Sequence, residues 1–319
     1  MRRRNFHAMV GGAAIAFPVF AHAQDAKRVP LVGVLIAGDP DIYLRFFRDG
    51  LRKAGYLEGK TVRLEIRHAL SGTEILAAQA RELVGLKVDL LVAIQTPAVH
   101  AAKQATTTMP IVMSAGDPVG TGLIASLARP GGNITGISSS VAELGGKLLQ
   151  LIREFRPGAK RIAVLANAVD PFTKSFLGQL QFAASAMKVD LRIFMMRRIE
   201  EYAGAFAEMG KGRIEAVIVQ PSLARRKALE LALQYRLPTV SPTGLFCEEG
   251  GLMSYSPNFE ETYASMAVYI DQIFKGAKPA DLPVQQPTKF DLQFNLSTAR
   301  AIGITIPQIL LARADRVIE

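Results

Sequence analysis

A chain of 319 residues, of which 49% are hydrophobic and 21% charged, is long enough to form two domains, each with its own core. Its formal net charge is +10, but the basic residues are scattered among acidic ones, so nucleic-acid binding is unsupported. The single cysteine, Cys247, excludes an intrachain disulfide and a metal-binding cysteine cluster, and is predicted to be a small packed residue.

The first 23 residues have the three parts of a secretory signal peptide. An arginine run at 2–4 is followed by an apolar run at 8–20 and by the small-residue cleavage pattern Ala21-His22-Ala23. A bilayer span needs ~20 apolar residues, so cleavage is favoured over a membrane anchor. We expect a periplasmic protein that begins at Gln24, exported by the general or the twin-arginine route.

Strand-like and helix-like patterns then alternate. Val29–Ile36 is continuously apolar, as expected of a strand buried on both faces. Apolar residues between Tyr43 and Ala54 recur at the spacing of an amphipathic helix. A β-α-β-α series of this kind predicts a parallel sheet covered by helices. Strands are expected at 29–36, 61–67, 88–94, 111–114 and 134–138, and helices at 43–54, at 76–84 and from about 97.

The pattern restarts near Leu144 and predicts a second α/β unit with its own sheet. Helices are expected at 144–155, 172–187, 200–209 and 223–235, and strands at 161–166, 191–195, 216–219, 239–240 and 252–255.

The tail adds a long helix from Phe259 to Phe274, a strand at Phe290–Leu296 and a last short helix that Ser297 could cap. These elements exceed two complete units, which suggests that the chain crosses back between two lobes. Crossings near 138–141, 255–257 and 283–287 could act as a hinge. The predicted division is a signal peptide at 1–23, an N-terminal lobe at 29–140 plus about 257–284, and a C-terminal lobe at 141–256 plus about 285–319.

Polar residues follow five of the predicted strands. In open parallel sheets, ligands bind beyond the carboxyl ends of the strands. Helix N-termini at these loops offer free N–H groups and a positive dipole, which suit a carboxylate or another small anion. Thr96, Asp170 and Ser222 also suit helix capping, so capping stays open as the alternative. The candidate ligand-binding residues in these loops are Gly38, Thr96, Ser114, Asp117, Asn167, Asp170, Gln220 and Ser222.

Enzyme motifs are mostly missing: there is no G-x-S-x-G, no H-E-x-x-H and no phosphate loop. Gly120–Ala125 fits the dinucleotide fingerprint G-x-G-x-x-A, with Glu143 further on. That fingerprint should follow the first strand of its unit, whereas here it follows the fourth, so a glycine-containing turn is favoured. No catalytic residue, metal site or cofactor is predicted, and an exported α/β enzyme with a nucleotide cofactor is kept as the alternative function.

Four motifs carry a family resemblance: T-P at 96–97, D-P-V-G at 117–120, G-G-N-I-T-G at 131–136 and K-P-A-D-L-P-V at 278–284. With them, the chain from about Val29 to Glu319 resembles the ABC-transporter substrate-binding family that includes tryptophan/tyrosine-type receptors. The resemblance implies an α/β fold with two Rossmann-like lobes, parallel sheets with flanking helices, type I periplasmic-binding-protein architecture and about three crossovers. It also implies no catalytic activity and no cofactor.

The resemblance further implies that Thr96, Ser114 and Asp117 face the cleft from the first lobe. In the second lobe, the loops at Asn167 and Gln220 and the aromatic Tyr255 are the matching places. The segment 241–251 departs most from the family pattern. Its Cys247-Glu248-Glu249 could alter specificity or lie outside the cleft.

These features predict a periplasmic receptor that closes around a small molecule and delivers it to the membrane permease of an ABC importer. The expected ligand is an amino acid or a small aromatic carboxylate, because Asp117 or Asp170 could pair with an ammonium group. Phe172, Phe246 or Tyr255 could pack on its apolar part. We expect a monomer without a nucleic-acid partner. A regulator's sensing domain is disfavoured by the export signal and by the lack of a helix-turn-helix segment ahead of the first strand.

Overall fold

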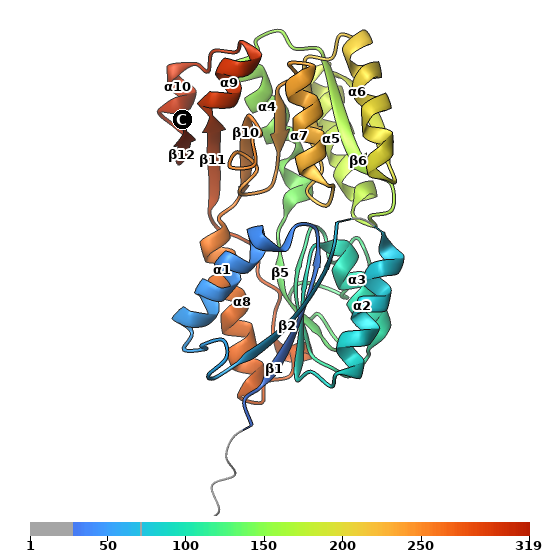
Figure 1. Cartoon of the computed structure of the whole chain (residues 1–319), viewed down its shortest axis with the longest axis vertical. Coiled ribbons are helices and arrows are strands. Elements are labelled where there is room, and N and C mark those ends of the chain that lie inside the picture. Colours follow the sequence, from blue (N-terminus) through green and yellow to red (C-terminus); the bar gives the residue numbers. More distant parts are fainter. Residues whose placement is uncertain (1–27, 71) are drawn as a thin grey trace, which may run out of the picture.

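The computed structural model describes residues 28–70 and 72–319, so the predicted signal peptide lies outside the described residues. Figure 1 shows two α/β lobes placed end to end along the long axis of the molecule. Each lobe has its own sheet with helices on both faces, which confirms the fold expected from the sequence. No helix in the described part of the chain is long and apolar enough to cross a bilayer.

The N-terminal lobe contains a five-stranded parallel sheet in the order β2-β1-β3-β4-β5. Helices α2 and α3 cover one face, and α1 and the tail helix α8 cover the other. Within the described stretch 116–133, which joins β4 to β5, the chain forms turns and no helix. The elements are β1 Leu31–Ala37, α1 Pro40–Lys53, β2 Arg63–Ala69, α2 Thr73–Gly85, β3 Leu90–Ile94, α3 Thr96–Ala105, β4 Ile111–Ala115, β5 Ile134–Ser138 and α8 Phe259–Phe274.

The C-terminal lobe contains a seven-stranded sheet in the order β12-β11-β10-β9-β8-β6-β7. Helices α4 and α5 pack on one face, and α6 and α7 on the other. The elements are η1 Val141–Leu144, α4 Gly145–Phe155, β6 Arg161–Asn167, α5 Thr173–Met187, β7 Asp190–Met196, η2 Ile199–Glu201, α6 Tyr202–Lys211, β8 Ala216–Val219, α7 Arg225–Gln234, β9 Thr239–Ser241, β10 Met253–Pro257, β11 Phe290–Asn295, α9 Leu296–Ile302, α10 Gln308–Leu311 and β12 Arg316–Ile318. The short helix η3 Pro279–Asp281 follows α8 and lies beside β5 of the N-terminal lobe.

Three segments connect the lobes: the chain leaves β5 for α4, leaves β10 for α8, and returns through 283–289 to β11. The returning segment runs beside β5, because Ser138 N donates to Gln285 O at 2.8 Å and Gln285 N donates to Gly136 O at 3.0 Å. This topology explains why β11 pairs antiparallel with β10, while the other strands of both sheets pair in parallel. The residue bounds of the two lobes stay a prediction.

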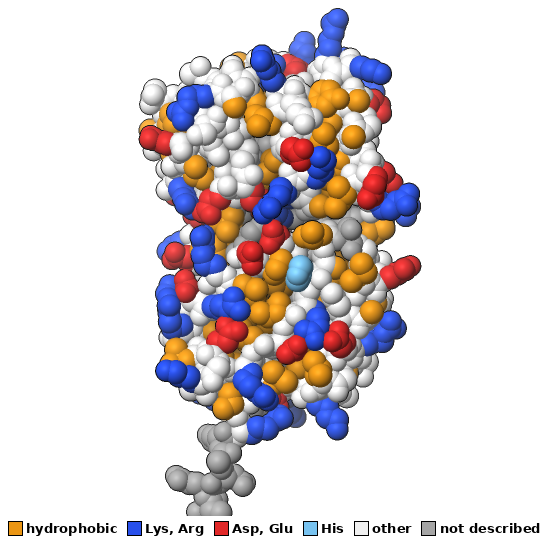
Figure 2. All heavy atoms as spheres, in the orientation of Figure 1, with side chains coloured by type: hydrophobic (Ala, Val, Ile, Leu, Met, Phe, Trp, Pro, Cys, Tyr) orange, Lys and Arg blue, Asp and Glu red, His pale blue; other side chains and the backbone are white. Residues whose placement is uncertain are grey.

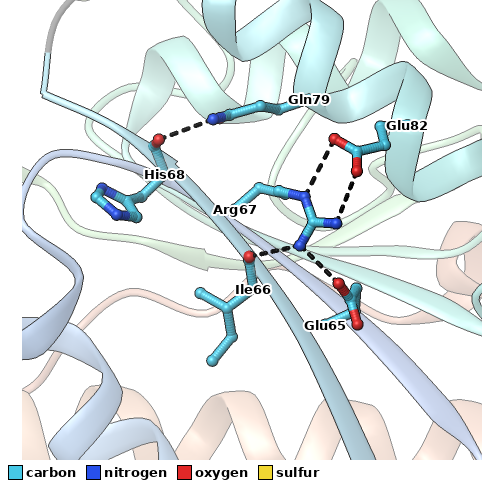
Figure 3. A network of polar contacts seen from close by, with 6 residues as sticks. All are labelled: Glu65, Ile66, Arg67, His68, Gln79 and Glu82. Carbon is cyan, nitrogen blue, oxygen red and sulfur yellow. Dashed lines mark hydrogen bonds and ion pairs between the residues drawn. The ribbon is translucent and has the colours of Figure 1, made fainter.

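The tail helix α8 is held on the N-terminal lobe by close packing against α1. A Cβ atom placed on Gly50 would lie 2.5 Å from the backbone oxygen of Tyr263, so this contact requires glycine. Edge strand β2 is tied to α2 by Arg67, whose Nε and Nη2 donate to the Glu82 carboxylate at 3.1 and 2.7 Å (Figure 3). Arg67 Nη1 also donates to Glu65 at 2.6 Å.

Two local expectations are corrected. Asn295, not Ser297, caps α9: its Oδ1 accepts from Thr298 N at 2.8 Å, because β11 leads directly into the helix and Ser297 falls in its first turn. Helix α10 and strand β12 were not expected, since each is too short to show a period. Cys247 is fully buried beside Ser254, as predicted, and burial raises the pKa of its thiol to about 12.

Candidate functional site

A cavity lies between the lobes, at the carboxyl ends of strands from both sheets. Its volume, counted as room for the centres of water molecules, is about 40 Å³. Gln95 and Ser114 reach it from β3 and β4, and Thr243 and Phe172 reach it from the C-terminal lobe. Since ~10–15 Å³ of such volume holds one water, the cavity has room for only a few water molecules. The two lobes therefore lie close together here.

One wall of the cavity is aromatic. The ring of Tyr43 lies 6.1 Å from that of Phe259 and 6.5 Å from that of Tyr263, centroid to centroid. Phe172 lines the cavity from the other lobe and packs on Phe176 at 5.7 Å. Side-chain hydroxyls, the Gln95 amide, and aliphatic, proline and glycine residues complete the lining. An apolar wall with a few placed polar groups is typical of a site for a small organic molecule.

Gln95 occupies a strained position at this wall. Its φ of 75° lies in the left-handed region, which non-glycine residues rarely adopt. This conformation falls at the end of β3, immediately before α3. There, Gln95 Nε2 donates to the hydroxyl of Tyr43 at 3.0 Å. The strained backbone of Gln95 therefore places its side-chain amide at the cavity wall.

Arg225 lies behind Tyr43, at the first position of α7, and only 5% of it is exposed. Its Nε and Nη2 donate to the carboxylate of Glu249 at 2.7 and 2.8 Å, and its Nη1 donates to Pro221 O at 2.6 Å. Tyr43 of the other lobe lies near this guanidinium. Burial lowers the pKa of Arg225, but Tyr43 and Glu249 outweigh burial and raise it, so the guanidinium stays charged.

Other contacts close the cleft around the cavity. Ser175 Oγ donates to Asp117 Oδ2 across the lobes at 2.6 Å, while Asp117 Oδ1 accepts from Gly120 N at 2.8 Å. A Cβ atom on Gly116 would lie 2.6 Å from the Phe172 ring, so the lobes meet at a glycine. Arg45 and Glu248 form an ion pair between lobes at 3.6 Å. The segment 241–251 thus contributes Glu248 and Glu249 to the interface between the lobes.

Of the residues predicted in the first lobe, Ser114 lines the cavity and Asp117 makes the contact with Ser175. Thr96 is 2% exposed, and its Oγ1 accepts from Gly116 N at 3.1 Å, so it holds the loop after β4. Gly38 has a φ of 135° and lies beside the ring of Tyr43.

The residues predicted in the second lobe form one hydrogen-bonded cluster. Gln220 Nε2 and Ser222 Oγ donate to Asp170 Oδ2 at 2.9 and 2.5 Å, and Gln220 Oε1 accepts from Asn167 N at 2.9 Å. Phe172 N donates to Asp170 Oδ1 at 2.9 Å. Burial raises the pKa of the Asp170 carboxyl. The cluster holds the loop that carries Phe172, so its members lie beside the cavity and bond mainly to one another.

Tyr255 and Phe246 lie away from the cavity lining. Tyr255 stacks on Phe290 at 5.8 Å within the C-terminal lobe, and Phe246 is fully buried in the core under α6 and α7. The ligand-binding role of the nine predicted residues stays a prediction.

Sequence reasoning missed Tyr43, Arg225 and the cavity face of α8, where Phe259, Thr262 and Tyr263 lie. Tyr43 and the α8 aromatics were interpreted as core stripes, which they also are. A signal was available for Gln95, which stands directly before Thr96 in a loop at a strand end.

Two other site types receive no support. No group of three His, Cys, Asp or Glu side chains in the described ranges could hold a metal ion. Gly120–Ala125 lies in turns and bends, without the strand–turn–helix context of a dinucleotide fingerprint.

On the face that Figure 2 shows, acidic and basic side chains are mixed over both lobes.

The chain is similar in sequence and in fold to known binding proteins. A tyrosine-binding protein of Clostridioides difficile is 25% identical over 263 residues, which are 81% of this chain and 75% of that protein. An ABC domain from Streptococcus pneumonia, solved with L-Trp, matches with a TM-score of 0.83 at 26% identity over 91% of this chain and 99% of its own.

A ligand-free, open structure of a substrate-binding protein with adhesive properties from Clostridium difficile matches with a TM-score of 0.63. Its identity is 24%, over 91% of this chain and 99% of its own. The family model described as ABC transporter substrate binding protein matches residues 34–318. The chain therefore belongs to the family of ABC transporter substrate-binding proteins.

Proposed function

We propose that the substrate of this binding protein is an amino acid or a small aromatic carboxylate, held in the cavity between the lobes. The observation that carries the proposal is the cavity wall, in which Tyr43, Phe259 and Tyr263 pack together beside the polar Gln95 and Ser114. An aromatic side chain would pack on the rings, while hydroxyl and amide groups would bind the polar end. A tyrosine-binding relative and a tryptophan-bound structural neighbour support this class.

Binding is proposed to act through closure of the lobes. The two solved structures have nearly equal identity to this chain, 26% and 24%, yet their TM-scores are 0.83 for the tryptophan complex and 0.63 for the open form. A different arrangement of the two lobes accounts for this difference in TM-score better than sequence divergence does. A ligand that touches both lobes would favour the closed form by its differential affinity, and would give the permease a surface to distinguish.

The setting proposed for this receptor follows from the leader and the family. The protein would be cleaved after Ala23, act as a monomer in the periplasm and deliver its ligand to the permease of an ABC importer. We infer that it acts by binding alone, without catalysis. The cavity supplies recognition groups, and its family is one of binding proteins.

The direct test is a thermal-shift screen of the mature chain from Gln24, unfolded and refolded to remove any co-purified ligand. The panel contains the twenty amino acids, aromatic acids, nucleosides and sugars. A ligand that binds only the native state at 100 times its Kd should add about 2.7 kcal/mol of stability. Amino acids or aromatic acids should raise Tm. Stabilisation by sugars or nucleosides alone would contradict the proposed class.

A further inference from the structure

Asp117 connects the two lobes, because its two carboxylate oxygens accept hydrogen bonds from different lobes. Oδ1 accepts from Gly120 N at 2.8 Å within its own loop, and Oδ2 accepts from Ser175 Oγ of α5 at 2.6 Å. Thr121 fixes the backbone of Asp117, since its N and its Oγ1 both donate to Asp117 O, at 3.0 and 2.6 Å. The first lobe therefore holds one oxygen and presents the other to the second lobe.

The motif D-P-V-G at 117–120 builds this arrangement. A Cβ atom on Gly120 would collide with Asp117 Oδ2, so the carboxylate can fold back over the turn only where the fourth residue is glycine. The bonds from Gly120 and Thr121 lie within the first lobe. The carboxylate can therefore hold its position before the two lobes meet.

Helix α5 offers a complementary end. Ser175 is the third residue of this 15-residue helix, and its first turn contains no acidic residue. The N-cap residue, Phe172, is apolar and cannot cap the helix with its side chain. A helix N-terminus has a partial positive charge and favours a negative group nearby. Asp117 supplies that group from the opposite lobe, and the Ser175 hydroxyl donates a charge-assisted hydrogen bond to it.

The contact lies beside the cavity. Gly116 and Phe172 line the cavity and meet each other there. Within the part of the chain that the structure describes, neither Asp117 nor Ser175 belongs to that lining. The hydrogen bond between them can therefore act on the lobes without touching a ligand.

This contact is better shielded from water than the ion pairs between the lobes. Asp117 and Ser175 are both half-buried. In the pair of Arg45 with Glu248, which spans 3.6 Å, the arginine side chain is 55% exposed. Exposed ion pairs contribute little, because water and salt screen them.

We propose that Asp117 and Ser175 form a latch, in which the carboxylate of Asp117 binds Ser175 and the N-terminus of α5 when the lobes approach. The latch stabilises the closed receptor without contacting its ligand. Asp117 is then a positioning residue and not the partner of a ligand's ammonium group. This inference rests on the proposed closure of the lobes. Because every ligand that closes the lobes also closes the latch, loss of the latch weakens all such ligands by the same factor.

The first test compares L-tyrosine with its deaminated analogue, in which hydrogen replaces the ammonium group. Affinities are measured by calorimetry on the wild type and on Ser175→Ala, with Ser185→Ala in the exposed last turn of α5 as the matched control. Ser175→Ala should weaken both compounds by the same factor, ~10-fold, and Ser185→Ala should weaken neither. Ser175→Thr keeps the hydroxyl and should restore most of the affinity. Wild-type affinity in Ser175→Ala would overturn the latch.

Asp117→Asn separates the latch from a role in ligand binding. If Asp117 acts through Ser175, this variant should also weaken both compounds equally, and its effect should be much smaller in the Ser175→Ala background. A loss for L-tyrosine alone would overturn the proposal, because Asp117 would then bind the ammonium group. A full, additive loss in the Ser175→Ala background would overturn it as well, and this measurement needs only one of the two compounds.

Failure of the proposed function gives a different result. If only a sugar or a nucleoside binds, the proposed ligand class fails, and the same variants measured with that compound still test the latch. If small-angle scattering shows that the bound wild type keeps its radius of gyration, closure fails and the latch fails with it. Unfolding curves of each variant, measured without ligand, show whether a change in affinity reflects a change in fold.

Discussion

Asp170 shows how a buried carboxyl group holds a loop of the cleft in place. It is 5% exposed, and it receives hydrogen bonds from Ser222, Gln220 and the backbone of Phe172. Burial raises the pKa of this carboxyl more than the three donors lower it. The carboxyl therefore holds the loop of Phe172 in place at an electrostatic cost.

This cost predicts a dependence of stability on pH. Because the pKa of Asp170 is higher in the folded state than its ordinary value, the folded state binds the proton more tightly. The corresponding stability is complete below about pH 4 and is lost as pH rises through the folded pKa. Asp170→Asn cannot lose a proton, so its free energy of unfolding, relative to wild type, should rise across that window and then level off. Urea unfolding between about pH 3.5 and 8 measures this difference, and a constant difference would contradict the assignment.

At the scale of single residues, sequence reasoning found loops more reliably than contacts. The positions after β3, β4, β6 and β8 could be predicted because parallel strands must end at one edge of a sheet. Thr96 and Gln220 lie in those loops, but their side chains bond to backbone and to neighbours. Tyr43 and Arg225 come from a helical stripe and a helix start, and only the approach of the two lobes brings them together.

Among the elements, the contact between α1 and α8 ties the tail to the first lobe. Gly50→Ala should destabilise the protein by roughly 1–3 kcal/mol, because its Cβ would meet the backbone of Tyr263, which cannot rotate away. Gly204→Ala in α6 is the control, since a Cβ atom there meets no described atom within 4 Å. It should stabilise by about 0.5–1 kcal/mol through helix propensity. Urea midpoints measure both changes, and equal effects would show that the helices can adjust.

Most elements could be predicted from their periods, including β5 and β8 with their observed bounds. The short pieces could not, because α10 and β12 span 4 and 3 residues and show no repeat. The antiparallel pairing of β10 with β11 depends on where the chain re-enters the lobe. That direction is a property of the crossover and not of either strand.

At the scale of the whole molecule, the two lobes meet at Gly116, beside the ring of Phe172. A side chain there would meet the Phe172 ring within 2.8 Å, so Gly116→Val should keep the lobes apart while each lobe keeps its own core. Closure is expected to be a rigid-body rotation at the three crossings. Without ligand, the variant and the wild type should unfold at similar temperatures.

Small-angle scattering can follow this motion on the ligand found in the screen. The wild type should become more compact when the ligand is added, because a ligand shifts the equilibrium only by its differential affinity for the closed form. Gly116→Val should keep its larger radius of gyration and bind more weakly, since the energy of closure is then opposed by the clash. Gly85→Val, at the end of α2 where a Cβ atom meets no described atom within 4 Å, should behave as the wild type does. A wild type that binds with an unchanged radius would show that the ligand does not close the lobes, and the site would then have to lie within one of them.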